Sequence, residues 1–194
     1  MPFTLSIGSF APKFCLAGVD GSVYSLDSFI DFPYLVVFFT CNHCPYVIAS
    51  DPLIAEVALK YRAKGVGFAG INSNSPEHYG EDSFAHMVQR MQEHNFPWFY
   101  LYDPTQDVAR SYGALRTPHY FVFDQERKLV YCGRGLDQPK NPEKSTINDL
   151  DNALDDLVSG RPIHTPLTNP IGCNVKWKGH DKHWMPEEAC DLVL

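Results

Sequence analysis

The chain has 194 residues, of which 44% are hydrophobic, and its formal net charge is −7 at pH 7. This length and apolar content suit one domain with extensions, folded around its own core. The acidic balance and the lack of a basic block argue against nucleic acid or an anionic membrane surface as partner. We find no secretory signal pattern and no stretch long enough to span a membrane, so we expect a cytoplasmic protein.

The six cysteines are irregularly spaced, so they do not indicate a dense disulfide framework. Only Cys41 and Cys44 have the Cys-x-x-Cys spacing of a redox or metal site. They follow an apolar run at residues 35–39, which predicts a buried strand, and they precede Pro45, which opens a helical pattern. The cysteine pair is therefore expected at the junction of a strand and a helix.

A thiol that faces the first turn of a helix lies near unpaired N–H groups and the positive end of the helix dipole, which lowers its pKa. We therefore expect Cys41 to be the attacking thiolate and Cys44, one turn further in, to be its resolving partner. Between them, His43 is either a solvated loop residue or an imidazolium that stabilises the Cys41 thiolate. The pattern predicts thiol–disulfide exchange.

Helical and extended patterns alternate along the rest of the chain, which predicts an α/β fold. A β-hairpin is expected at residues 13–25, around Asp20-Gly21. A helix that ends at Gly65 and is kinked at Pro52 precedes a strand at 66–72. That strand runs through a Gly-x-Gly-x-x-Gly pattern at 65–70, but a dinucleotide site needs a helix that opens on the glycines, so we reject this site.

The second half continues the alternation and then changes character. The expected elements are a helix at 84–91, a strand at 98–101, a short helix at 108–112, an antiparallel strand pair at 120–124 and 129–132, and a final helix. We expect Ser145 or Thr146 to cap that last helix, Ile147 to lie on its buried face, and Gly160 to end it. Residues 161–194 contain four prolines and little periodicity, so we expect an irregular arm on a domain that spans residues 1–160.

This order of elements around a Cys-x-x-Cys motif resembles the thioredoxin fold, which implies a central mixed β-sheet flanked by helices. Thr117-Pro118 stands where thioredoxin-like proteins place a cis-proline that faces the disulfide, so the resemblance implies that both residues bind substrate. The segments 8–14, 41–45, 70–74, 101–103 and 171–177 are similar to peroxiredoxin-like, thioredoxin-family bacterial proteins of the redoxin type. The resemblance spans nearly the whole chain. It implies a thiol–disulfide oxidoreductase of cell redox homeostasis, without a bound cofactor, that exchanges electrons with another thiol protein.

The chain departs from these families in two places. Peroxidatic peroxiredoxins carry Pro-x-x-x-Thr-x-x-Cys, which neither Cys41 nor Cys44 fits, and Pro118 stands where those enzymes use an arginine. A weak thiol peroxidase with an antioxidant role is therefore an alternative. Thioredoxins also carry a buried acid beneath the disulfide, and the matching residue here is Leu35, so proton transfer to Cys44 needs another route, such as water.

Metal binding gives the remaining alternatives. Thiolates and imidazole suit copper, so Cys41, Cys44 and His119 could form a copper-binding or delivery module. A structural zinc site needs two further ligands, which the region of the motif lacks, so we expect redox chemistry and no metal there. In the arm, a conceivable zinc set has a spacing that fits no common motif; it consists of Cys173, His180, His183 and Cys190. Cys173 alone is either a buried anchor of the arm or a third redox thiol.

Overall fold

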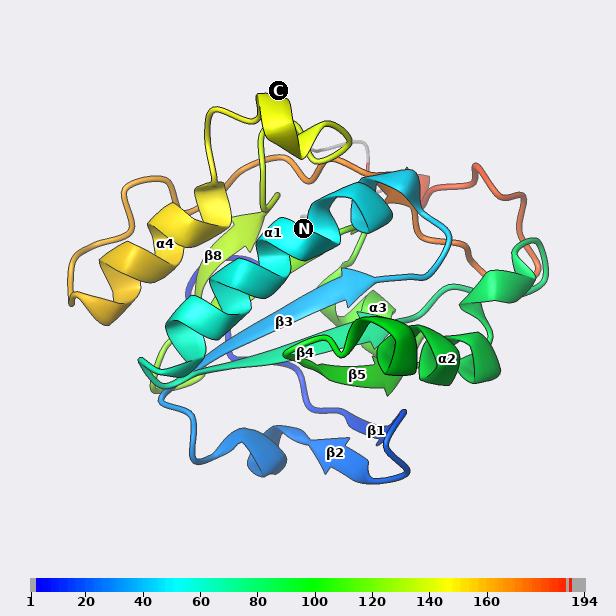
Figure 1. Ribbon diagram of the computed structural model, residues 1–194, viewed down its shortest axis with the longest axis horizontal. Helices are drawn as coiled ribbons and strands as arrows, with labels where there is room; N and C mark the ends of the chain where they lie inside the picture. The colour runs from blue at the N-terminus through cyan, green and yellow to red at the C-terminus, as the bar shows by residue number, and fades with distance from the viewer. Residues whose placement is uncertain (1–2, 188, 190–194) are drawn as a thin grey trace.

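The computed structural model describes residues 3–187 and 189, which form a mixed sheet with helices on both faces (Figure 1). The seven strands lie in the order β2-β1-β5-β4-β3-β7-β8. They are β1 (Cys15–Gly18), β2 (Val23–Ser25), β3 (Tyr34–Thr40), β4 (Val66–Asn72), β5 (Phe99–Tyr102), β7 (His119–Phe123) and β8 (Leu129–Gly133). The α-helices are α1 (Pro45–Arg62), α2 (Phe84–His94), α3 (Asp107–Tyr112) and α4 (Asp149–Val158).

Strand β3 is an interior strand of the sheet. It pairs in parallel with β4 and antiparallel with β7, so the sheet is mixed as expected. Its side chains alternate between two cores. Leu35, Val37 and Phe39 pack on the side of α3, whereas Val36 and Phe38 pack on the side of α1, α2 and α4. The run is apolar at nearly every position because both faces of the strand are covered.

The flanking elements confirm most of the sequence predictions. The hairpin of β1 and β2 is antiparallel and pairs with β5, and β7 and β8 form the expected antiparallel pair. Within the described residues, short 3-10 helices lie in connections: η1 (Leu26–Phe29), η2 (Gly80–Asp82) and η3 (Pro142–Lys144). A second, two-stranded sheet joins β6 (Arg116–Thr117) to β9 (Cys173–Asn174), so a segment of the arm lies against the residues that precede Pro118.

The start of the last helix differs from the prediction. Asn148 is its N-cap, and the side chain of Asn148 accepts a hydrogen bond from the Asp151 backbone N–H at 3.0 Å. Ser145 and Thr146 instead bind the carboxylate of Asp137 through their hydroxyl groups. Ile147 therefore precedes the helix and is 43% exposed, and the prediction that it lies on the buried face is wrong.

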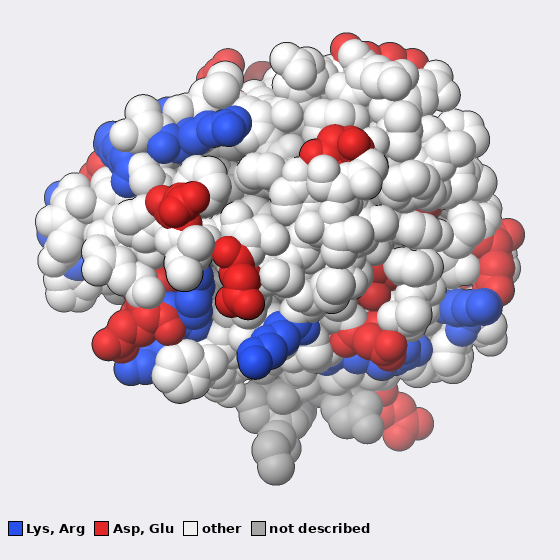
Figure 2. All heavy atoms as spheres, turned by 90° about the horizontal axis from the view of Figure 1, so that it is seen from below, with Lys and Arg blue, Asp and Glu red and all other residues white. Residues whose placement is uncertain are grey.

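Among the described residues, no helix is both long and apolar enough to cross a membrane. On the face drawn in Figure 2, lysine and arginine side chains are interspersed with acidic ones, in keeping with the dispersed charges of the sequence.

Candidate active site

The two cysteines of the motif lie between β3 and α1. Cys41 follows the last residue of β3, and Cys44 is the N-cap of α1, which begins at Pro45. A proline starts a helix well because its φ is already helical and its missing N–H would have no partner in the first turn. Cys44 therefore lies just outside the helix, and the prediction that it lies one turn inside is wrong. Both side chains are buried, Cys41 with 1% and Cys44 with 0% of its surface exposed.

The peptide bond between Thr117 and Pro118 is cis and faces this pair, in the place that the sequence indicates. The protonated Cys44 Sγ donates a hydrogen bond to the Thr117 carbonyl oxygen at 3.1 Å. Cys41 Sγ lies 3.4 Å from the Thr117 hydroxyl oxygen. One residue next to the cis peptide bond thus contacts both thiols.

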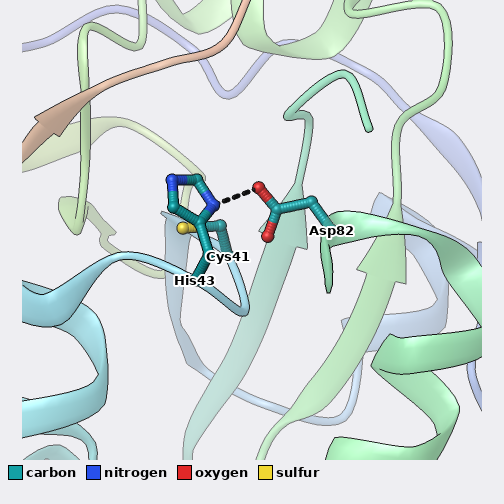
Figure 3. Close-up of side chains that lie close together, drawn as sticks. All are labelled: Cys41, His43 and Asp82. Carbon is teal, nitrogen blue, oxygen red and sulfur yellow. Dashed lines mark hydrogen bonds and ion pairs between the residues drawn. The ribbon is translucent and has the colours of Figure 1, made fainter. Parts of the chain in front are cut away.

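His43 is held on two sides. Its Nδ1 lies 2.6 Å from a carboxylate oxygen of Asp82 (Figure 3). Its ring stacks on Tyr79 at 3.7 Å between centroids. Only 9% of the His43 side chain is exposed, so it is not a solvated loop residue. The ligand atoms of Cys41, His43 and Asp82 all lie within 4.8 Å of one another.

Asp82 comes from η2, which brings a fully buried carboxylate to the end of β3. Besides His43, this carboxylate accepts hydrogen bonds from the Asn42 backbone N–H and the Asn74 side-chain amide, both at 2.8 Å. Sequence reasoning missed Asp82, because it lies 39 residues from His43 and belongs to no motif. The polar residues at the end of β4, which include Asn74, were the only indication of a buried polar site there.

The environments of the two thiols differ in charge. Burial, hydrogen bonding with Cys44 and the negative charge of Asp82 raise the pKa of Cys41 well above its ordinary value. Hydrogen bonding from the thiols of Cys173 and Cys41 lowers the pKa of Cys44. These directions are opposite to the lowered pKa expected at Cys41: they favour a thiolate at Cys44, at the helix N-terminus, over one at Cys41, beside Asp82.

A known protein family matches most of the chain. The redoxin family profile matches residues 6–154. The chain belongs to the redoxin family. A search of functionally curated proteins found no match.

Solved structures similar to this redoxin cover most or nearly all of it. An uncharacterized conserved protein from Geobacillus kaustophilus is 38% identical, with a TM-score of 0.86 over 93% of this chain and 96% of that one. A hypothetical protein from Sinorhizobium meliloti 1021 is 34% identical, with a TM-score of 0.85 over 91% and 97%. The thioredoxin domain of a thiol-disulfide oxidoreductase from Bacteroides vulgatus is 23% identical, with a TM-score of 0.58 over 71% and 95%. The last likeness confirms the thioredoxin-like fold.

The structure of this redoxin bears on the metal-binding alternatives. Cys41, His43 and Asp82 are the one group of three or more possible metal ligands among residues 3–187 and 189. His119 does not join the cysteines: its Nδ1 accepts from the Leu115 N–H and its Nε2 contacts Cys132 Sγ, both at 3.4 Å. The copper site with His119 is therefore wrong. In the arm, Cys190 of the conceivable zinc set lies outside the described residues.

Proposed function

We propose that this redoxin is a thiol–disulfide oxidoreductase whose working thiols are Cys41 and Cys44. One arrangement carries the proposal: two adjacent buried thiols face the cis peptide bond before Pro118, and one of them caps a helix. A thiolate is the species that attacks a disulfide, and a helix N-terminus favours the negative charge. Two thiols in reach of each other can pass two electrons to a substrate disulfide.

In the proposed reaction, Cys44 attacks and Cys41 resolves, which reverses the roles expected from the sequence. The Cys44 thiolate attacks one sulfur of the substrate disulfide, forms a mixed disulfide and releases the first substrate thiol. Cys41 then attacks Cys44 Sγ, which releases the second substrate thiol and leaves a Cys41–Cys44 disulfide. The lowered pKa of Cys44 and the raised pKa of Cys41 support this order.

Resolution of the mixed disulfide requires Cys41 to lose its proton. His43 and Asp82, with ligand atoms within 4.8 Å of Cys41 Sγ, form a pair that can accept it. This pair takes the role that a buried acid in the place of Leu35 would have. His43 acts here together with the Asp82 carboxylate that contacts its Nδ1, and not as an isolated side chain.

Thr117 and Pro118 are proposed to hold the substrate. An extended segment can pair with the backbone of a short strand such as β6, as peptides do when they add to a sheet edge. The segment would place its cysteine beside Cys44, which contacts the Thr117 carbonyl. The partners we propose are therefore thiol or disulfide proteins, and no bound cofactor takes part in the steps above.

Reduction of insulin by chemically reduced protein tests the proposal. Cys44→Ser should abolish the reaction, whereas Cys41→Ser should still attack and should pass through a mixed disulfide on Cys44. Cys15→Ser is the matched control, because Cys15 is exposed on β1 and should not affect the rate. Full activity in Cys44→Ser would refute the assignment, and adducts that accumulate on Cys41 instead would restore the roles expected from the sequence.

A further inference from the structure

The arm returns to the candidate active site. Figure 1 shows the chain after α4 (orange) running back past the sheet to the N-terminal end of α1, where β9 lies. Cys173 pairs with Thr117 and Asn174 with Arg116 in an antiparallel register. This is the backbone edge that we assign to an extended substrate. A strand of the protein itself therefore occupies the substrate position.

The fit of the arm at this edge is close. A Cβ atom added to Gly172 would lie 2.1 Å from the Thr117 carbonyl oxygen, so only glycine allows the backbones to approach this far. The Arg116 guanidinium donates hydrogen bonds to the Gly172 carbonyl and to the side chain of Asn174. The register of β9 is thus fixed on both sides of Cys173.

Directly after β9 the arm is anchored. Val175 donates its backbone N–H to the Leu115 carbonyl at 3.1 Å, and Lys176 donates its backbone N–H to the Asn74 side chain at 2.8 Å. Val175 and Trp177 are buried in the core on the side of α3. Cys173 therefore lies two residues from a fixed point, and its thiol stays close to the pair at a high effective concentration.

The three thiols are arranged around one sulfur. Cys173 packs against the cluster that contains Cys41 and Cys44. Cys44 interacts with the thiols of both Cys41 and Cys173, so it is the sulfur that two alternative disulfides would share. Cys173 is only partly buried, whereas the other two are almost completely covered. It is therefore the member of the three that an external reagent reaches first.

We propose that Cys173 is a third redox-active thiol, which forms a disulfide with Cys44 in exchange with the Cys41–Cys44 disulfide. This inference rests on the proposed function, which supplies the first disulfide. In the step, Cys173 attacks Cys44 Sγ, the Cys41–Cys44 bond breaks and the Cys44–Cys173 bond forms. Cys41 leaves as a thiolate and takes up the proton that Cys173 gives up. One disulfide replaces another, so the step needs no further oxidant.

Disulfide mapping after oxidation by glutathione disulfide tests this exchange on the full chain. The protein is quenched in acid, its free thiols are alkylated, and it is cleaved at aspartates, including Asp20 and Asp31, which separates Cys15 from the motif. In Cys41→Ser, glutathione should attach to Cys173 or Cys44 and then be displaced by the other thiol, which leaves a Cys44–Cys173 cross-linked peptide. Adding Cys173→Ser should abolish the cross-link and leave glutathione on Cys44. Adding Cys15→Ser instead should change nothing.

The outcomes separate the two proposals. A Cys44–Cys173 cross-link in wild-type protein and in Cys41→Ser supports the inference. A Cys41–Cys44 disulfide in wild-type protein and stable glutathione on Cys44 in Cys41→Ser, with Cys173 fully alkylated in both proteins, overturn the inference and leave the proposed function standing. If wild-type protein forms neither a Cys41–Cys44 disulfide nor any adduct on Cys44, the proposed function itself fails. The wild-type measurement needs no substitution, so misfolding of a variant cannot decide the result.

Discussion

Replacement of Asp82 by asparagine tests how the buried carboxylate supports the site. The carboxylate accepts three hydrogen bonds, from the Asn42 N–H, the Asn74 amide and His43 Nδ1. In Asp82→Asn the remaining oxygen can keep the bond from Asn42, but the new amide group turns two N–H donors toward Asn74 and His43. His43 can adapt by changing tautomer and accepting one of them. Asn74 cannot, so one buried donor faces another.

The expected cost follows from these contacts. Leaving a buried donor unsatisfied costs about 1–3 kcal/mol. For a protein of this size, each kcal/mol corresponds to a fall in Tm of roughly 2–4 °C. We therefore expect the Tm of Asp82→Asn to fall by roughly 2–12 °C. The pKa of Cys41 should fall as well, because the negative charge that raises it is gone.

Two measurements check this prediction: thermal unfolding followed by circular dichroism, and the pH dependence of alkylation at Cys41 followed by mass spectrometry. Glu81→Gln is the matched control, since Glu81 is the exposed neighbour of Asp82 and undergoes the same change of an acid to its amide. Glu81→Gln should leave both readouts unchanged. If Asp82→Asn unfolds at the wild-type temperature and alkylates with the wild-type profile, the carboxylate neither supports the loop nor acts on Cys41.

Three further predictions concern other parts of the molecule. Burial raises the pKa of Asp51 to about 6 from an ordinary value of 3.8, despite the charge of Arg90, so the native state holds this proton more tightly than the unfolded chain. The stability that the proton gives is complete below the unfolded pKa of Asp51. As pH rises toward 6 this contribution, about 3 kcal/mol, is lost. Urea unfolding should show this fall in wild-type protein and not in Asp51→Asn. Gly172→Ala should push β9 away from Thr117 and speed alkylation of Cys44, whereas Gly80→Ala, with open space around its Cβ, should not; equal rates would refute the fit. Hydrogen peroxide should oxidise the protein far more slowly than a dedicated peroxiredoxin, because Cys44 contacts a carbonyl group and two other thiols; stopped-flow rates as fast as those enzymes would contradict this.

Local patterns predicted the sheet and its helices because their causes are local. The apolar run of β3 is continuous since both of its faces are covered, and the ends of α1 follow from Pro45 and the glycine after the helix. Pro45 also indicates which cysteine is the N-cap of α1, and the sequence interpretation did not use this indication. A proline at the first helical position makes the preceding residue the N-cap, so Cys44 and not Cys41 belongs at the positive end of the dipole.

The polar part of the site could not be predicted, because it depends on contacts between distant segments. Asp82 reaches His43 from 39 residues away, through a single turn of 3-10 helix that has no periodic pattern. Strand β9 has only two residues and pairs with a strand that is also two residues long. Alternation of apolar and polar residues cannot be recognised over two positions. The sequence suggests Cys173 as a possible redox thiol, but it does not predict that Cys173 lies beside Cys44.

The position of β9 also constrains how a protein substrate can enter. A substrate strand that pairs with Thr117 must first displace Cys173 and Asn174 from their pairing with β6, which also breaks the contact of Asn174 with Arg116. The next residues are harder to move, because the Lys176 carbonyl accepts hydrogen bonds from Ser75 and Gln106, both at 2.8 Å, and Trp177 is only 3% exposed. Net contributions of about 0.5–1.5 kcal/mol per hydrogen bond make a short displacement feasible and a complete release of the arm costly. Entry by local exchange of one strand for another is therefore favoured over opening of the whole arm, and after each exchange the anchor returns Cys173 to the same sulfur.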